Sequence, residues 1–184
     1  MDGLSSSISI IASLTIFVIS LFNNNFLITI LSISLVGSLL AFLKFNWAPA
    51  KIYLGDAGSM LIGMILGSLT IMTDYTKYND AGFLIAIIIL AIPVFDISYV
   101  IILRLLKGKS PFLGSPDHFS LRLRKKKKLS TSQTIIYIII IQLIITILAI
   151  VCFFLSLMVT IIIMLCIVLF FSIFGLWLSS EKME

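Results

Sequence analysis

The stretch FLITILSISLVGSLLAFLKFNWAPAKIYLGDAGSMLIGMILGSLTIM, residues 26–72, shows how this chain is built. Two apolar runs flank a polar interruption at residues 46–59, which contains one proline, one lysine, one aspartate and two glycines. An apolar run of about 18 residues or more can cross a bilayer as a helix. The stretch therefore predicts two transmembrane helices joined by a short polar loop.

The remainder of the chain follows the same pattern. Of its 184 residues, 60% are hydrophobic and only 11% are charged, a balance that excludes an ordinary soluble domain. The sequence predicts an all-α, polytopic helix bundle in the membrane, with one transmembrane domain over residues 1–184. Six transmembrane helices are expected, at roughly 5–22, 26–43, 58–73, 82–106, 133–152 and 155–178.

The cations are divided unequally between the two sides that this topology creates. If both termini lie on one side, Lys77 is the only cation of the other side. Basic loops remain in the cytosol, so we expect the basic side and both termini to be cytosolic, in the cell membrane. The run RLRKKKK, residues 122–128, adjoins the membrane, and an anionic lipid or substrate is its expected partner, with no nucleic acid. The basic side carries Lys44, Lys51, Arg104, Lys107, Lys109, Arg122, Arg124, Lys125 to Lys128 and Lys182.

Asp56 is the acidic residue of the interrupting loop, and it precedes the third predicted span. A helix that starts near Ala57 would direct its N–H groups and its positive dipole end toward the cytosol, which favours phosphate. Asp56 could then hold Mg²⁺, or Mn²⁺ in its place, against a diphosphate. It could equally be an N-cap, and the two roles are compatible. Gly55 and Gly58 allow a tight turn close to a bound group.

Three features lie inside the predicted spans. Asp96 is a carboxylate in an apolar helix, which indicates either a function or a buried partner such as Lys51. Pro93 is expected to free a backbone carbonyl and kink the same helix. Gly63 and Gly67 have the spacing of a close contact between two helices.

The cytosolic loop at residues 107–132 contains the single histidine, His118, with Asp117 before it and Arg122 after it. Histidine exchanges protons near neutral pH, and either the histidine or the arginine can contact phosphate. A solvated histidine in a basic loop is the other interpretation.

These motifs, in this order, resemble the polyprenyl-phosphate N-acetylhexosamine-1-phosphate transferases. That family has a loop of the form N-x-x-P-A-K-I-F/Y-M/L-G-D-x-G-S, and NWAPAKIYLGDAGS, residues 46–59, matches it nearly throughout. PVFDISYVIILRLLKGKSPF, residues 93–112, looks like the family's span with a proline and an aspartate. HFSLRL, residues 118–123, is similar to the family's H-I-H-H-R-L, with Ser120 and Leu121 at histidine positions. The opening MDGLSSS resembles the end of N-x-x-N-x-x-D-G-L-D-G-L, with Asp2 as the first aspartate.

The resemblance implies a reaction and its participants. N-acetylhexosamine 1-phosphate would pass from a UDP-N-acetylhexosamine to polyprenyl (undecaprenyl) phosphate, releasing UMP, in cell-wall or surface polysaccharide synthesis. Asp56 would bind Mg²⁺, and Asp56 and His118 would be the catalytic residues. Asp96 would stabilise the site without contacting the substrate. The substrate-binding residues would be Asp2, Asn46, Lys51, Gly55, Gly58, Ser59, Asp117 and Arg122.

The resemblance covers only the C-terminal half of the family. The earlier spans and an early paired-aspartate motif are absent from this sequence, so the alternative to an active transferase is an inactive fragment or one half of a split transferase that needs a partner chain. A homodimer is a further alternative. A small membrane transporter is the alternative from another class, and it predicts discontinuous helices and a polar path through the membrane. Apart from Asp96 and Gln142, the spans offer few polar groups for such a path.

Overall fold

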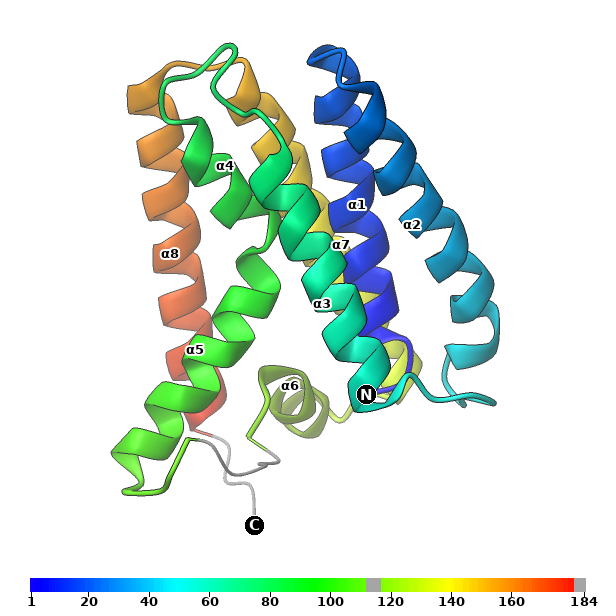
Figure 1. Ribbon diagram of the computed structural model, residues 1–184. Coiled ribbons are helices and arrows are strands. Elements are labelled where there is room, and N and C mark those ends of the chain that lie inside the picture. Colours follow the sequence, from blue (N-terminus) through cyan, green and yellow to red (C-terminus); the bar gives the residue numbers. More distant parts are fainter. Residues whose placement is uncertain (112–116, 181–184) are drawn as a thin grey trace.

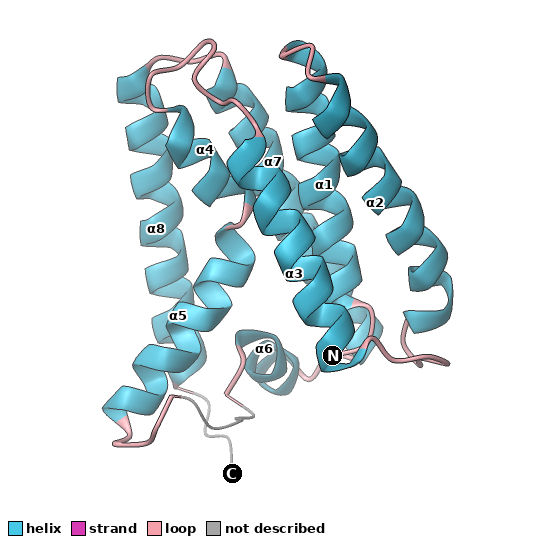
Figure 2. Ribbon diagram, in the orientation of Figure 1, coloured by secondary structure: helices cyan, strands magenta, loops and turns pink. Residues whose placement is uncertain are grey.

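The computed structural model describes residues 1–111 and 117–180, and within these ranges it contains helices and no strands (Figures 1 and 2). Five helices are long and apolar enough to cross a membrane, and the number is six if the bent pair of α4 and α5 is counted as one span. The predicted all-α, polytopic bundle is therefore confirmed. The helices are α1 (Leu4–Phe22), α2 (Phe26–Asn46), α3 (Gly55–Met72), α4 (Gly82–Ile89), α5 (Ala91–Leu106), α6 (Phe119–Lys127), α7 (Thr131–Phe153) and α8 (Leu157–Ser179).

Helix α1 is the most enclosed of the spans. It packs against α2, α7 and α3, and 61% of its apolar window is buried, against 17% for α8 (Figure 1). Its serines allow this close packing, since Ser6 and Ser13 are both fully buried and small side chains let neighbouring helices approach. The outer faces of the other helices expose large apolar side chains, as a lipid environment requires.

The fourth span is broken, with a bend of 70° between α4 and α5. Pro93 accounts for the break, because proline has no N–H and its ring clashes with the carbonyl four residues earlier, which is that of Ile89. The freed carbonyl of Ile89 accepts a hydrogen bond of 3.0 Å from Nε2 of Gln142 on α7. An unsatisfied carbonyl is costly in a membrane, so the buried Gln142 stabilises the break. The predicted kink is confirmed. Gln142, one of the two polar residues noted within the spans, has a structural partner.

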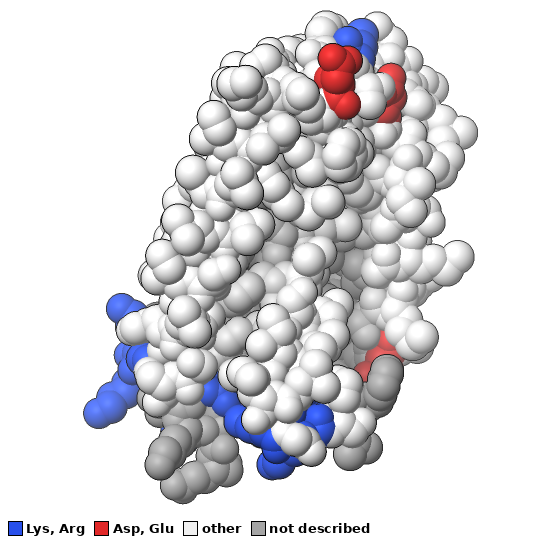
Figure 3. All heavy atoms as spheres, turned by 90° about the vertical axis from the view of Figure 1, so that its left-hand side faces the viewer, with Lys and Arg blue, Asp and Glu red and all other residues white. Residues whose placement is uncertain are grey.

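The connections lie in two groups at opposite ends of the bundle, as the six-span topology predicts (Figure 1). The turns at residues 23–25 and 154–156 and the loop at residues 73–81 lie at one end. The N-terminus, residues 47–54, residues 107–111 and α6 lie at the other, which we call the basic end. Figure 3 shows lysine and arginine side chains gathered there. Lys182 lies outside the described residues.

Gly63 and Gly67 do not make the close helix contact that their spacing predicts. A Cβ atom added at either glycine would meet no atom within 4 Å. Only 22% of the apolar window of α3 is buried, so the glycine face of this helix points away from the described part of the chain. The prediction is wrong for contacts within these ranges, because sequence spacing defines a helix face and not what covers it.

Candidate functional site

Asn46 holds together the loop that follows α2. Its side chain is buried, and its Oδ1 accepts a hydrogen bond of 2.9 Å from the backbone N–H of Gly3. Its Nδ2 donates to the carbonyl of Ile52, also at 2.9 Å. Asp2 adds a longer contact, accepting from the N–H of Ala50 at 3.4 Å. In this structure Asn46 and Asp2 join the N-terminal segment to the loop, and their substrate-binding role stays a prediction.

Asp56 lies in the first turn of α3 and is not its N-cap. The helix begins at Gly55, two residues earlier than expected, and Leu54 is the N-cap residue, with no side-chain hydrogen bond to the helix. Gly55 has a φ of 66°, a left-handed conformation that glycine adopts without strain and that turns the chain into α3. Asp56 is exposed, as are Ser59 in the same turn and Lys51 in the loop before it. The carboxylate therefore reaches solvent beside the positive end of the helix dipole.

This arrangement fits a magnesium ion that is shared with a phosphate ligand. Among the described residues, no group of three or more His, Cys, Asp or Glu side chains could hold a metal ion. Mg²⁺ is commonly bound by one or two carboxylates, with water and phosphate oxygens as the other ligands. Asp56 could supply such a carboxylate, and the uncapped start of α3 favours a phosphate next to it.

His118 is held by Asp96 across the space between α5 and α6. Its Nδ1 lies 2.8 Å from Oδ2 of Asp96, and the other oxygen of Asp96 accepts from the N–H of Phe119 at 3.1 Å. A carboxylate only accepts hydrogen bonds, so Nδ1 donates and Nε2 is left to exchange a proton. The hydrogen bond that His118 donates to Asp96 raises the pKa of His118 above its usual value, and partial burial opposes this rise. The partner of Asp96 is thus His118 and not Lys51.

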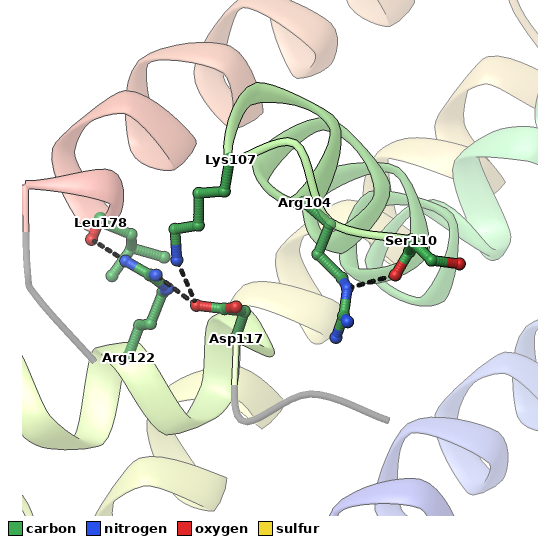
Figure 4. Close-up of polar contacts among 6 residues, drawn as sticks. All are labelled: Arg104, Lys107, Ser110, Asp117, Arg122 and Leu178. Carbon is green, nitrogen blue, oxygen red and sulfur yellow. Dashed lines mark hydrogen bonds and ion pairs between the residues drawn. The ribbon is translucent and has the colours of Figure 1, made fainter. Parts of the chain in front are cut away.

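Asp117 and Arg122 form a buried contact that joins three helices (Figure 4). Arg122 is only 1% exposed. Its Nη2 donates to Oδ1 of Asp117, and its Nη1 donates to the carbonyl of Leu178 near the end of α8, at 3.4 Å. Lys107, just after α5, lies 3.0 Å from the same oxygen of Asp117. Asp117 and Arg122 thus connect α5, α6 and α8. Because both side chains are buried, the structure does not favour their predicted contacts with the substrate.

The predicted site residues form two clusters at the basic end. One is built on the loop and the start of α3, and the other on α5 and the start of α6, which lies between α5 and α3 in Figure 1. Sequence reasoning missed the part that Lys107 plays, although a cation directly after a span is a signal for an interfacial contact. The first cluster contains Asp2, Asn46, Lys51, Gly55, Asp56, Gly58 and Ser59, and the second contains Asp96, Asp117, His118 and Arg122.

Comparison with known proteins identifies relatives of the chain. Residues 1–74, which include the loop and Asp56, match the model of glycosyl transferase family 4. The chain is 36% identical over 152 residues to a probable undecaprenyl-phosphate N-acetylglucosaminyl 1-phosphate transferase of Bacillus subtilis; this match covers 82% of the chain and 42% of that relative. Two phospho-N-acetylmuramoyl-pentapeptide-transferases also match. That of Clostridium beijerinckii is 39% identical over 71 residues, which is 39% of the chain and 22% of the relative. That of Prochlorococcus marinus is 38% identical over 111 residues, 56% of the chain and 30% of the relative.

The chain thus spans less than half the length of these curated relatives. The segment that matches the family model includes the loop motif, and the structure brings this motif to an exposed position at the basic end. Residues 1–74 thus match glycosyl transferase family 4, and the resemblance predicted from the sequence is confirmed over part of the chain.

Proposed function

We propose that the chain contributes to the transfer of N-acetylhexosamine 1-phosphate from a UDP-sugar to a polyprenyl phosphate, with release of UMP. The observation that carries this proposal is the match of residues 1–74 to the family, since it includes the Asp56 loop. The basic end would face the cytosol, where the nucleotide sugar arrives, while the lipid phosphate would reach the same end from the membrane.

The geometry of the first cluster supports a phosphoryl-transfer site. Two anions must meet in this reaction, and catalysis of this kind consists mainly of positioning and charge stabilisation. Asp56 would hold Mg²⁺, or Mn²⁺, between the phosphates, and the ion would neutralise the charge that develops between them. Lys51 is exposed in the same loop and would attract the diphosphate. Ser59, in the first turn of α3, donates its hydroxyl to the carbonyl of Asp56 at 2.9 Å and stabilises that turn.

His118 would complete the site from the α6 side. Its side chain is 49% exposed, so Nε2 can reach a ligand while Asp96 fixes the ring through Nδ1. A histidine oriented in this way can donate a hydrogen bond to a phosphate oxygen or accept a proton near neutral pH. Asp96 would then act through His118, without contact to the substrate.

The proposal should be tested first with UDP-N-acetylglucosamine as the donor. The match to the relative named for that sugar covers 82% of the chain, whereas the matches to the two relatives named for the muramoyl pentapeptide cover 39% and 56%. The family's paired carboxylates would come from a further segment or a partner chain, because Asp56 offers a metal ion only one carboxylate.

The test is UMP release in membranes of cells that naturally make the protein, which hold any further segment or partner that the reaction requires. With undecaprenyl phosphate, UDP-N-acetylglucosamine and Mg²⁺, we expect Asp56→Asn to lower UMP release by roughly 100-fold or more. The amount of protein in the membrane should not change, because the carboxylate of Asp56 is exposed and is not packed in the interior. Asp80→Asn is the matched control, an exposed aspartate at the opposite end, and it should leave release unchanged. Wild-type release by Asp56→Asn would overturn the metal-ligand assignment.

A further inference from the structure

The C-terminal half of α6 has an open pocket with no part in the two clusters described above. Its volume is about 290 Å³. The turn that ends α6 forms one side of it, with Lys128 in a left-handed conformation at a φ of 53°. In this turn the N–H of Leu129 donates to the carbonyl of Arg124 at 3.1 Å, and that of Lys128 donates to the carbonyl of Lys125 at 3.2 Å. The pocket, which we call the α6 pocket, is lined by Leu121, Arg124, Lys125, Lys128 and Leu129.

The structure divides the six cations of residues 122–128, which the sequence predicted as a group to meet an anionic partner. Arg122 is buried and pairs with Asp117. Lys126 donates to the carbonyl of Trp177, so it joins α6 to α8. Three of the other cations are exposed and line the α6 pocket: Arg124, Lys125 and Lys128.

The positive charge of the α6 pocket is not balanced by the side chains around it. No acidic side chain lines the pocket, and no ion pair within the described ranges involves Arg124 or Lys128. Two carbonyl groups at the end of α6 already accept backbone N–H groups, so these side chains are not required to cap the helix. The charge therefore favours an anion that the described chain does not supply.

The pocket lies at the level of the lipid headgroups. Helix α7 begins at Thr131, three residues after Lys128, and its 23 residues extend about 35 Å at 1.5 Å per residue. The hydrocarbon core of a bilayer is about 30 Å thick, so Lys128 lies just outside it. Figure 1 shows α6 almost end-on while α7 and α8 are seen from the side, so α6 runs across the basic end. Trp177, whose ring centre is 4.4 Å from Nζ of Lys126, is an aromatic residue typical of the membrane interface.

The chemistry of the lining fits a phosphate that carries hydrocarbon. Arginine and lysine donate charge-assisted hydrogen bonds to phosphate oxygens. Leu121 and Leu129 add apolar surface beside the cations, which a soluble anion would not use. Basic clusters directly next to a transmembrane helix recognise anionic headgroups. Figure 3 shows lysine and arginine side chains that project sideways from the basic end, where lipid adjoins the bundle.

We propose that the α6 pocket binds the phosphate of an anionic phospholipid, with Arg124 and Lys128 as contacts and Leu121 and Leu129 against the start of its acyl chains. The bound lipid would hold the end of α6 and the start of α7 at the membrane surface. Lys128 is ten residues from His118, about 15 Å along the helix, so this site does not depend on the transfer proposed above.

The test is lipid retention by the full chain, purified from its native membranes with whatever accompanies it and then delipidated. Equal amounts of phosphatidylglycerol and phosphatidylcholine with the same acyl chains are supplied, and native mass spectrometry counts the lipids that stay bound. We expect one phosphatidylglycerol per chain, preferred roughly ten-fold over phosphatidylcholine. Arg124→Gln with Lys128→Gln should lower this preference to about two-fold or less, because attraction to an anionic headgroup rises with each cation beside it.

Two control variants separate the pocket from the overall charge of the basic end. Lys44→Gln with Lys109→Gln removes the same charge from exposed positions outside the pocket and should keep the preference. Arg124→Lys with Lys128→Arg retains the charge of the pocket and should also keep it. Equal retention of the two lipids by the wild type would overturn the proposal, as would equal loss of preference in the pocket variant and the Lys44 and Lys109 variant.

Soluble phosphates distinguish a lipid site from a general phosphate site. An excess of glycerol 3-phosphate should not displace phosphatidylglycerol, because it has no hydrocarbon to contact Leu121 and Leu129. Displacement by glycerol 3-phosphate or by UDP-N-acetylglucosamine would overturn the proposal, because the pocket would then bind a soluble phosphate.

Discussion

The loop at residues 46–59 and the segment at residues 117–127 lie at the same end of the bundle, and each contains one aspartate and at least one cation. In the loop, Asp56 and Lys51 are exposed, and the carboxylate of Asp56 makes no hydrogen bond or ion pair within the described ranges. In the second segment, Asp117 and Arg122 are buried and bound to each other. The same residue types are thus exposed to solvent in one segment and take part in helix packing in the other.

The difference lies in what holds each segment in place. The loop is held by a neutral amide, Asn46, which bonds to two backbone groups and leaves the charged side chains exposed. The α6 segment is held by its own charges, through Asp117 and Arg122. The proposed metal-binding role of Asp56 requires an accessible carboxylate, and a neutral scaffold leaves it accessible. The mutations below test this division, from the largest expected effect to the smallest.

Arg122→Ala should destabilise the protein by about 3 kcal/mol. It removes the buried cation that pairs with Asp117 and leaves this buried carboxylate with Lys107, whose side chain is much more exposed, as its ion-pair partner. Unfolding in detergent, followed by the loss of helical circular dichroism, measures the change. Lys51→Ala is the matched control in the loop, and its effect should stay within about 0.5 kcal/mol because that lysine is exposed. Unchanged stability together with a raised KM for the nucleotide sugar would instead assign Arg122 to the substrate.

Asn46→Ala should destabilise the protein by about 2 kcal/mol and loosen the loop. The change leaves the N–H of Gly3 and the carbonyl of Ile52 without their partner. Trypsin should then cleave after Lys51 faster than in the wild type. The control is Asn25→Ala at the opposite end, which removes the N-cap of α2 and costs about 1 kcal/mol without exposing Lys51. Equal cleavage rates in both variants would show that the loop does not depend on Asn46.

Asp96→Asn should have the smallest effect, about 0.5 kcal/mol or less, because His118 is half exposed. The pKa of His118 is raised in the folded protein by the hydrogen bond that it donates to Asp96, while the nearby amino group of Met1 lowers it and Asp117 raises it. The contact therefore stabilises the fold fully below the ordinary pKa of 6.5 and is lost as the pH rises through the higher folded pKa.

Since His118 is the only histidine of the chain, its NMR titration can be followed without assignment of others. Asp96→Asn should lower the measured pKa, and the difference in unfolding temperature from the wild type should shrink between pH 6 and pH 9. Asp80→Asn provides the comparison, with no expected change in the His118 titration. A wild-type pKa in Asp96→Asn would show that the two side chains do not meet in solution.

Much of this fold could be predicted from local pattern. Apolar runs of sufficient length define the spans, because an isolated stretch in lipid must satisfy its own backbone hydrogen bonds as a helix. The break after Ile89 follows from Pro93 alone, although the sequence did not indicate that Gln142 would satisfy the freed carbonyl. The start of α3 was misplaced by two residues because Gly55, in a left-handed conformation, begins a helix without a capping side chain.

By itself, the sequence determined the membrane class, the six spans, the two groups of connections and the loop that carries Asp56. These depend on hydrophobicity, helix length and local turn chemistry, all of which act between near neighbours in the chain. Only the tertiary structure decided that Asp96 would pair with His118, that Arg122 would be buried against Asp117 and the end of α8, and that Asp56 would remain exposed. The free energy of a charged side chain depends on its solvent exposure and on the charges around it, and neighbours distant in sequence fix both.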